Sequence, residues 1–210
     1  MKLFDGLWAP SPRKVRIFLA EKGIEVERIT LDLRKDEQLA PAYLTVNPRG
    51  MLPALLLDDG TLIDESAAIC RYFEALHPEP SLFGRNAREI ALIESWTRRI
   101  ESDCYAAVAD VFRNSLPAFR DRAMSGKWPP IAQISELVTR GRIMFGAFVQ
   151  AAEAQLAEHP FIACDYYSYA DITLLTALDF GKNVNLIPPE ELTHLNNWLT
   201  GVRQRKSAEA

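Results

Sequence analysis

The chain has 210 residues, of which 48% are hydrophobic and 25% are charged, and its formal net charge is −4 with a pI near 5.5. This composition is ordinary for a globular protein of one or two domains. The acidic balance argues against a nucleic-acid partner, because phosphate binding requires clustered positive charge. No apolar run is long enough to span a membrane, and the first residues, M-K-L-F-D-G-L-W, lack the apolar core of a signal peptide. We therefore expect a cytoplasmic protein with no membrane partner.

The first third of the chain predicts an α/β unit. Short strands are expected at residues 2–4 and 26–31, with a helix at residues 12–22 between them. A hairpin is expected over residues 54–63, because two apolar runs flank the turn-forming sequence D-D-G. Apolar residues then recur with helical spacing at Ile69, Tyr72, Phe73 and Leu76. Strands that alternate with helices in this way are typical of a sheet covered by helices.

Residues 46–71, V-N-P-R-G-M-L-P-A-L-L-L-D-D-G-T-L-I-D-E-S-A-A-I-C-R, are the most informative stretch. Pro53 directly precedes an apolar run, and because proline cannot donate to a sheet ladder it marks a strand's first residue or a special turn. A cis bond between Leu52 and Pro53 is expected. The backbone groups of Leu52 would then be open to an extended peptide, and the helix that opens at Glu65 and Ser66 could hold charged groups at its first turn.

The second half of the chain predicts a separate helical domain. Residues 77–84, H-P-E-P-S-L-F-G, carry two prolines and a glycine, which marks a linker. Long helical patterns follow, and they are interrupted by Trp-Pro-Pro at 128–130. We expect a first domain at residues 1–77, a linker at 78–85 and an all-helical second domain at 86–210.

Four separated motifs resemble those of the cytosolic glutathione transferases. They are A-P-S-P-R-K-V-R-I-F-L-A-E-K-G at residues 9–23, N-P-R-G-M-L-P-A-L at 47–55, D-E-S-A-A-I-C-R-Y at 64–72 and S-Y-A-D-I-T at 168–173. Because the motifs occur in the right order over nearly the whole chain, the resemblance is specific. It implies an α/β thioredoxin-like, glutathione-binding domain followed by an all-α helical domain, in a bacterial-type member with a serine in its catalytic loop.

Ser11 lies where this family places the residue that hydrogen-bonds the glutathione sulfur, so the resemblance implies a catalytic hydroxyl. Two other interpretations stay open. Ser11 followed by Pro12 also has the form of a helix N-cap with proline at the first helical position, and backbone N–H groups of the same loop could be the donor instead. The basic residues Arg13, Lys14 and Arg16 follow, and either they face an anionic ligand or they lie on a solvated face.

The resemblance assigns glutathione binding to Leu52, Pro53, Glu65 and Ser66. In the family, an acidic and a hydroxyl residue at the last two positions bind the γ-glutamyl end. On pattern alone, Glu65 and Ser66 are equally well explained as an acid in a first helical turn and a cap. Their functional assignment therefore depends on the resemblance.

Two positions depart from the family pattern. Met51 stands where many relatives carry a lysine or glutamine that reaches the glycyl carboxylate, so either Arg49, Arg13 or another basic group replaces it or the protein prefers a modified thiol ligand. Cys164 stands where a glycine is usual, which suggests a strained or altered turn and a semi-exposed thiol. The sequence S-Y-A-D at residues 168–171 predicts a capping box with a structural role.

The chemistry expected from these motifs uses the sulfur of glutathione itself. No cysteine occurs between residues 5 and 20, and the three histidines and three cysteines form no metal-binding spacing. We therefore expect glutathione as cosubstrate, no metal, and a glutathione transferase that activates the thiolate for addition to small hydrophobic electrophiles. The alternatives are a glutathione-dependent disulfide reductase or peroxidase and a non-catalytic interaction module. The resemblance also implies a homodimer.

Overall fold

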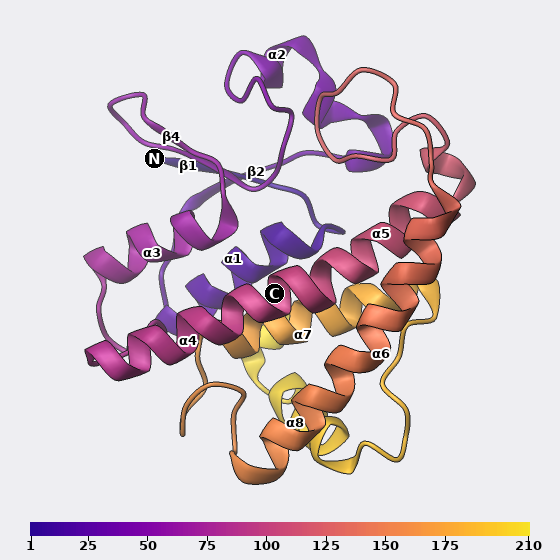
Figure 1. Cartoon of the computed structure of the whole chain (residues 1–210). Coiled ribbons are helices and arrows are strands. Elements are labelled where there is room, and N and C mark those ends of the chain that lie inside the picture. The colour runs from indigo at the N-terminus through magenta and orange to yellow at the C-terminus, as the bar shows by residue number, and fades with distance from the viewer. The chain divides into compact units, whose positions relative to one another are not determined.

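The computed structural model describes residues 1–210 (Figure 1). Contacts divide the chain into two units, one formed by residues 1–80, 124–129 and 210 and the other by residues 81–123 and 130–209. The first unit contains all the strands and the second is helical, which confirms the predicted fold class. The domain ranges expected from the sequence, with their linker, stay a prediction. None of the helices is long and apolar enough to cross a membrane.

A four-stranded sheet of order β2-β1-β3-β4 forms the centre of the first unit. Its strands are β1 (Lys2–Asp5), β2 (Glu27–Thr30), β3 (Ala54–Leu56) and β4 (Leu62–Ile63). Strand β1 pairs parallel with β2 and antiparallel with β3, and β3 pairs antiparallel with β4. The parallel pair requires a crossover connection, which α1 (Pro10–Lys22) supplies. The strands predicted near the N-terminus and the predicted hairpin are confirmed.

Helices cover both faces of this sheet. Helices α1 and α3 (Ser66–Leu76) lie on one face and the short α2 (Pro41–Leu44) on the other (Figure 1). The α2 side is packed around Phe4, Tyr43 and Ala54, and the two aromatic rings lie 5.3 Å apart. Two 3₁₀ turns, Leu33–Lys35 and Glu37–Leu39, precede α2. Alternating side chains of β1 and β3 thus enter two different hydrophobic layers.

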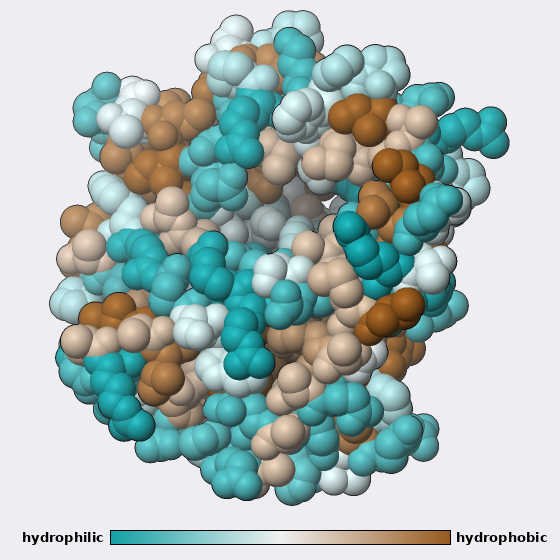
Figure 2. Space-filling view, viewed as in Figure 1, coloured by the Kyte–Doolittle hydropathy of each residue, from teal (hydrophilic) through white to brown (hydrophobic).

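The edge of the sheet at β4 is short and partly apolar. Hydrophobic residues gather there on the face seen in Figure 2, and Leu62 and Ile63 of β4 are half-buried. The preceding turn is closed by Gly60, whose φ of 86° lies in the left-handed region. A two-residue edge strand offers few unpaired backbone groups, which limits edge-to-edge association.

The start of α1 differs from the prediction. The helix begins at Pro10 rather than Pro12, and the N-cap is Ala9, with φ −94° and ψ 138° and no side-chain capping bond. Proline is favoured at the first helical position because its φ is already helical and its missing N–H needs no partner, and Pro10 meets this condition as well as Pro12 does. The N-cap interpretation of Ser11 is therefore wrong, and Ser11 lies inside the first turn.

The second unit consists of helices around a buried central helix. Its elements are α4 (Ala87–Arg99), α5 (Ala106–Ser115), α6 (Ser135–Glu158), α7 (Tyr169–Gly181) and α8 (Thr193–Arg203), with 3₁₀ turns at Pro117–Phe119, Lys182–Val184 and Lys206–Glu209. All residues of α7 except Asp179 and Phe180 are buried. A π-helical segment, Ile100–Tyr105, joins α4 to α5. Apolar residues with helical spacing continue across this junction and are buried, namely Ile93, Trp96, Ile100, Cys104 and Val111.

The predicted capping box at the start of α7 is confirmed. The backbone N and the Oγ of Ser168 donate to Oδ2 of Asp171 at 2.9 and 2.8 Å. Oδ1 of Asp171 accepts from Ile162 N at 3.0 Å and from Trp198 Nε1 at 3.1 Å. Burial raises the pKa of Asp171 to about 6, although these donors act in the opposite direction. The carboxylate therefore ties three segments of the second unit together.

Cys164, just before this box, does not behave as expected. The non-glycine residues with positive φ are Asp36 and Asn185, so the backbone at Cys164 is not in the left-handed region. Its side chain is buried, and burial raises the pKa of its thiol. The expectations of a strained backbone and of a semi-exposed thiol are therefore wrong, and the alternative of an altered turn stays a prediction.

Candidate active site

Three connecting segments meet at one end of the sheet in the first unit. Strand β1 ends at Asp5, and its neighbour Phe4 is paired with Ala54, the first residue of β3. Strand β4 ends at Ile63, which is paired with Leu55 of β3. The segment after β1, the segment before β3 and the segment after β4 therefore leave the sheet at the same end. These segments carry all five residues that the sequence assigned to the site: Ser11, Leu52, Pro53, Glu65 and Ser66.

Leu52 presents an unused pair of backbone groups at this end. The Leu52–Pro53 peptide bond is cis, which confirms the expectation. Neither the N–H nor the C=O of Leu52 takes part in a hydrogen bond within the chain. The Leu52 side chain packs against Gly6, where an added Cβ would lie 3.1 Å from Leu52 Cδ1. Unpaired backbone groups next to a strand are what an extended peptide requires.

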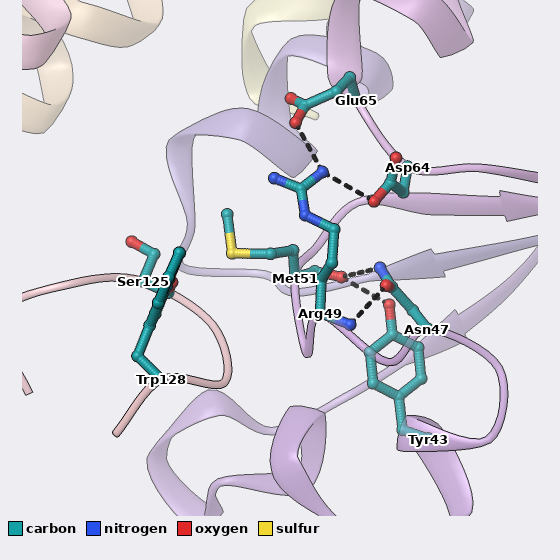
Figure 3. A network of polar contacts seen from close by, with 8 residues as sticks. All are labelled: Tyr43, Asn47, Arg49, Met51, Asp64, Glu65, Ser125 and Trp128. Carbon is teal, nitrogen blue, oxygen red and sulfur yellow. Dashed lines mark hydrogen bonds and ion pairs between the residues drawn. The ribbon is translucent and has the colours of Figure 1, made fainter. Parts of the chain in front are cut away.

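The turn before Leu52 is held by two buried side chains (Figure 3). Tyr43 Oη donates to the carbonyl of Met51 at 2.6 Å, and Asn47 Nδ2 donates to the same carbonyl at 3.1 Å. Asn47 Oδ1 accepts from the backbone N of Arg49 at 3.0 Å. Burial raises the pKa of Tyr43 to about 12, so its hydroxyl stays protonated as a donor. These bonds fix the backbone that positions Leu52.

Residues 124–129 belong to the first unit and pack on this turn. The backbone N of Lys127 donates to the carbonyl of Arg49 at 2.8 Å. Gly126 has a φ of 85°, and an added Cβ would lie 2.6 Å from both the Arg49 carbonyl and Met51 Sδ. Figure 3 shows Ser125 and Trp128 beside Met51. The sequence predicted only a helix break near this segment, because no local signal indicates which distant turn a loop will contact.

Arg49 forms ion pairs at the start of α3. Its Nη1 lies 2.8 Å from Asp64 Oδ2 and 3.0 Å from Glu65 Oε1 (Figure 3). The hydrogen bonds to Glu65 and Asp64 raise the pKa of the guanidinium above its usual value. All three side chains reach solvent, so the pairs are screened and contribute little to stability. Arg49 is one of the basic groups that could bind the glycyl carboxylate of glutathione, and it is already paired with two carboxylates of the chain.

The N-terminus of α3 is open. Glu65 is the N-cap residue but its side chain makes no capping bond, and Ser66 is the first helical residue. The first helical hydrogen bond runs from Ile69 N to Glu65 O, so the N–H groups of residues 66–68 have no helical partner. The Ser66 side chain is buried and makes no hydrogen bond within the chain. The interpretation of Glu65 and Ser66 as a self-sufficient cap is therefore wrong.

At the N-terminus of α1, Ser11 is the residue that provides hydrogen-bond donors. Pro10 and Pro12 lack an N–H, so Ser11 supplies both the only backbone donor of residues 10–12 and a hydroxyl. The first turn contains no acidic residue, and the positive end of the helix dipole is not neutralised by one. This helix end can therefore stabilise an anion placed against it.

The three cysteines, Cys70, Cys104 and Cys164, are free and buried. Burial raises the pKa of Cys104 and Cys164, which keeps these thiols protonated. No group of three or more His, Cys, Asp or Glu side chains is arranged to hold a metal ion.

Comparison with known families agrees with this geometry. Residues 8–76 match the family model for the glutathione S-transferase N-terminal domain, and residues 144–206 match that for the glutathione S-transferase C-terminal domain. The first match contains all five residues assigned to the candidate site. The second contains the capping box of α7.

Individual relatives extend the match over the whole chain. Glutathione S-transferase 2 of Saccharomyces cerevisiae is 34% identical over 211 residues, which cover 100% of this chain and 88% of that protein. Glutathione S-transferase F11 of Arabidopsis thaliana is 28% identical, with coverage of 98% and 94%. The crystal structure of Gtt2 from Saccharomyces cerevisiae superposes with a TM-score of 0.89 at 33% identity and covers 100% of this chain and 99% of its own. The chain therefore belongs to the glutathione S-transferase family of enzymes.

Proposed function

We propose that this transferase binds glutathione across the sheet end and adds its thiolate to small hydrophobic electrophiles. The Leu52 backbone, next to Pro53, pairs with the peptide backbone of glutathione. Glu65 and Ser66 hold its γ-glutamyl end, and the Ser11 hydroxyl stabilises its sulfur. The observation that carries the proposal is the unpaired Leu52 backbone, which lies at the same sheet end as the N-terminus of α1 and the open N-terminus of α3. We also propose that the protein forms a homodimer. Within each chain, we propose domains at residues 1–77 and 86–210, joined by a linker at 78–85.

The energetics of thiol activation are within reach of these groups. A free thiol has a pKa near 8.5, and lowering it by about two units requires roughly 2.7 kcal/mol. A charge-assisted hydrogen bond contributes about 1.5–3 kcal/mol. A helix N-terminus adds about 0.3–1 kcal/mol, and more when it is partly buried. The Ser11 hydroxyl together with the start of α1 is therefore sufficient, without a general base.

Replacing Ser11 with Ala should raise the pKa of bound glutathione. In a glutathione titration at neutral pH, followed by the ultraviolet absorbance of the thiolate, we expect a saturable signal for the wild type. The signal of Ser11→Ala should fall about tenfold or more, since one charge-assisted hydrogen bond is lost. Glutathione affinity, measured by calorimetry, should change much less.

Each other outcome of this titration has a definite meaning. An unchanged signal in Ser11→Ala would transfer the role to backbone donors, and no signal in the wild type would favour a non-catalytic module. Turnover of a glutathione-linked disulfide but not of aryl halides would favour the reductase alternative over the transferase.

Replacing Glu65 with Ala should weaken glutathione binding. We expect the dissociation constant to rise about tenfold or more, because the γ-glutamyl ammonium loses a charged partner. The free energy of unfolding should change by less than about 1 kcal/mol, because the Arg49–Glu65 pair is exposed. Asp64→Ala is the matched control, since it removes the other carboxylate bound by Arg49. Equal affinities for the wild type and Glu65→Ala would contradict the assignment.

A further inference from the structure

A buried ion pair lies directly behind the segment between β1 and α1. Arg16 Nη1 of α1 is 2.7 Å from Oδ1 of Asp5, the last residue of β1. The two residues are 6% and 1% exposed. An ion pair this deeply buried is costly to form, because both charges lose their hydration. Apolar residues of similar volume often stabilise a fold equally well, so stability alone does not explain why this ion pair is present.

Both members of the pair also bind the backbone of this segment. Asp5 Oδ1 accepts from the N–H of Gly6 at 2.8 Å, and Arg16 Nη2 donates to the carbonyl of Leu7 at 3.1 Å. The planar guanidinium thus joins the strand carboxylate and the loop carbonyl at a fixed separation. A further bond from Ala9 N to Gly6 O, of 3.1 Å, closes the turn that leads into α1. Four consecutive loop residues are therefore set by the pair and by the turn beside it.

The same segment touches the residue that offers its backbone to a peptide. An added Cβ at Gly6 would lie 3.1 Å from Leu52 Cδ1 and 3.2 Å from Leu33 Cδ1. The segment that leads to Ser11 and the Leu52 side chain are therefore packed together at Gly6, so their relative placement depends on the position of Gly6. Thiolate stabilisation depends on such placement, since a misplacement of about 1 Å can lower a rate about a hundredfold.

One atom of the pair remains unsatisfied. Oδ2 of Asp5 is buried and has no hydrogen-bond partner. Such groups are uncommon in native structures, and a functional role is one explanation for them. The pair is thus better suited to holding the loop than to maximising the stability of the first unit.

We propose that Asp5 and Arg16 are positioning residues, whose ion pair holds residues 6–9 so that Ser11 and the start of α1 meet the glutathione sulfur beside Leu52. The inference rests on the proposed glutathione site. It assigns no contact with substrate to either residue. It accounts for a basic residue in the second turn of α1 whose charge is directed towards the sheet rather than towards solvent.

The test is Arg16→Lys, which keeps the charge but not the planar fork. A single ammonium cannot reproduce the bonds to Asp5 and Leu7 in one geometry. We expect the pKa of bound glutathione, from the pH dependence of thiolate absorbance, to rise by about one unit from about 6.5, which is about threefold less thiolate at neutral pH. The glutathione dissociation constant should change less than about threefold. Arg28→Lys, at an exposed position of β2, is the matched control and should leave both quantities unchanged.

A second variant covers the case in which Arg16→Lys does not fold. The double variant Asp5→Leu/Arg16→Met removes both charges together and leaves no unpaired buried ion. It loses the bond to Leu7, so it should show the same rise in the pKa of bound glutathione. A lower melting temperature with an unchanged thiolate pKa in a folded variant would overturn the inference and leave the pair a purely structural role. Absence of a thiolate signal in the wild type would instead contradict the proposed function.

Discussion

Replacing Asp171 with Ala should destabilise the protein by about 3–5 kcal/mol, the range found when a buried charged network loses one member. The carboxylate accepts four hydrogen bonds, from Ile162 N, Ser168 N, Ser168 Oγ and Trp198 Nε1. Truncation leaves all four donors buried without a partner, and each such group costs about 1–3 kcal/mol. The value is measured by denaturant unfolding at neutral pH.

Asp165→Ala provides the matched control for this substitution. Asp165 is an exposed aspartate six positions away in the loop that precedes α7. We expect a change within about 0.5 kcal/mol for it, as for most surface substitutions. A loss below about 1 kcal/mol in Asp171→Ala would mean that the donors find other partners and that the capping box is dispensable.

The features predicted correctly from the sequence are the local ones. The capping box needs only a serine and an acid three residues apart before an apolar run, and both its members act within one helical turn. The strand before α1 and the hairpin that follows Pro53 are likewise encoded by short patterns. Local rules failed at α1, because Pro10 and Pro12 each satisfy the preference for the first helical position.

Contacts between distant parts of the chain could not be predicted. Arg49 pairs with Asp64 and Glu65 across fifteen or sixteen residues, and Gly126 packs on the turn that holds Met51. The Asp5–Arg16 pair was also missed, since the basic run at the start of α1 reads equally well as a solvated face. Such contacts depend on how elements pack rather than on spacing within any one of them.

Two glycines of α6 illustrate the same limit. Gly141 and Gly146 both lie inside this helix, where glycine is unfavourable, and the sequence alone does not distinguish them. In the structure an added Cβ at Gly141 would lie 2.5 Å from the Ala107 carbonyl and 2.9 Å from Val111 Cγ2 of α5. At Gly146 nothing lies within 4 Å. Gly141 therefore permits the close approach of two helices, whereas Gly146 is a surface position.

The two substitutions by alanine should consequently have opposite signs. Gly141→Ala should destabilise the protein by about 1–3 kcal/mol, because the added methyl group forces α5 and α6 apart against a backbone atom. Gly146→Ala should stabilise it by up to about 1 kcal/mol, the difference in helix propensity between the two residues. Denaturant unfolding of both variants measures the two changes under identical conditions. Equal and small effects would show that the α5–α6 contact can relax, and that Gly141 is not required for the approach of these helices.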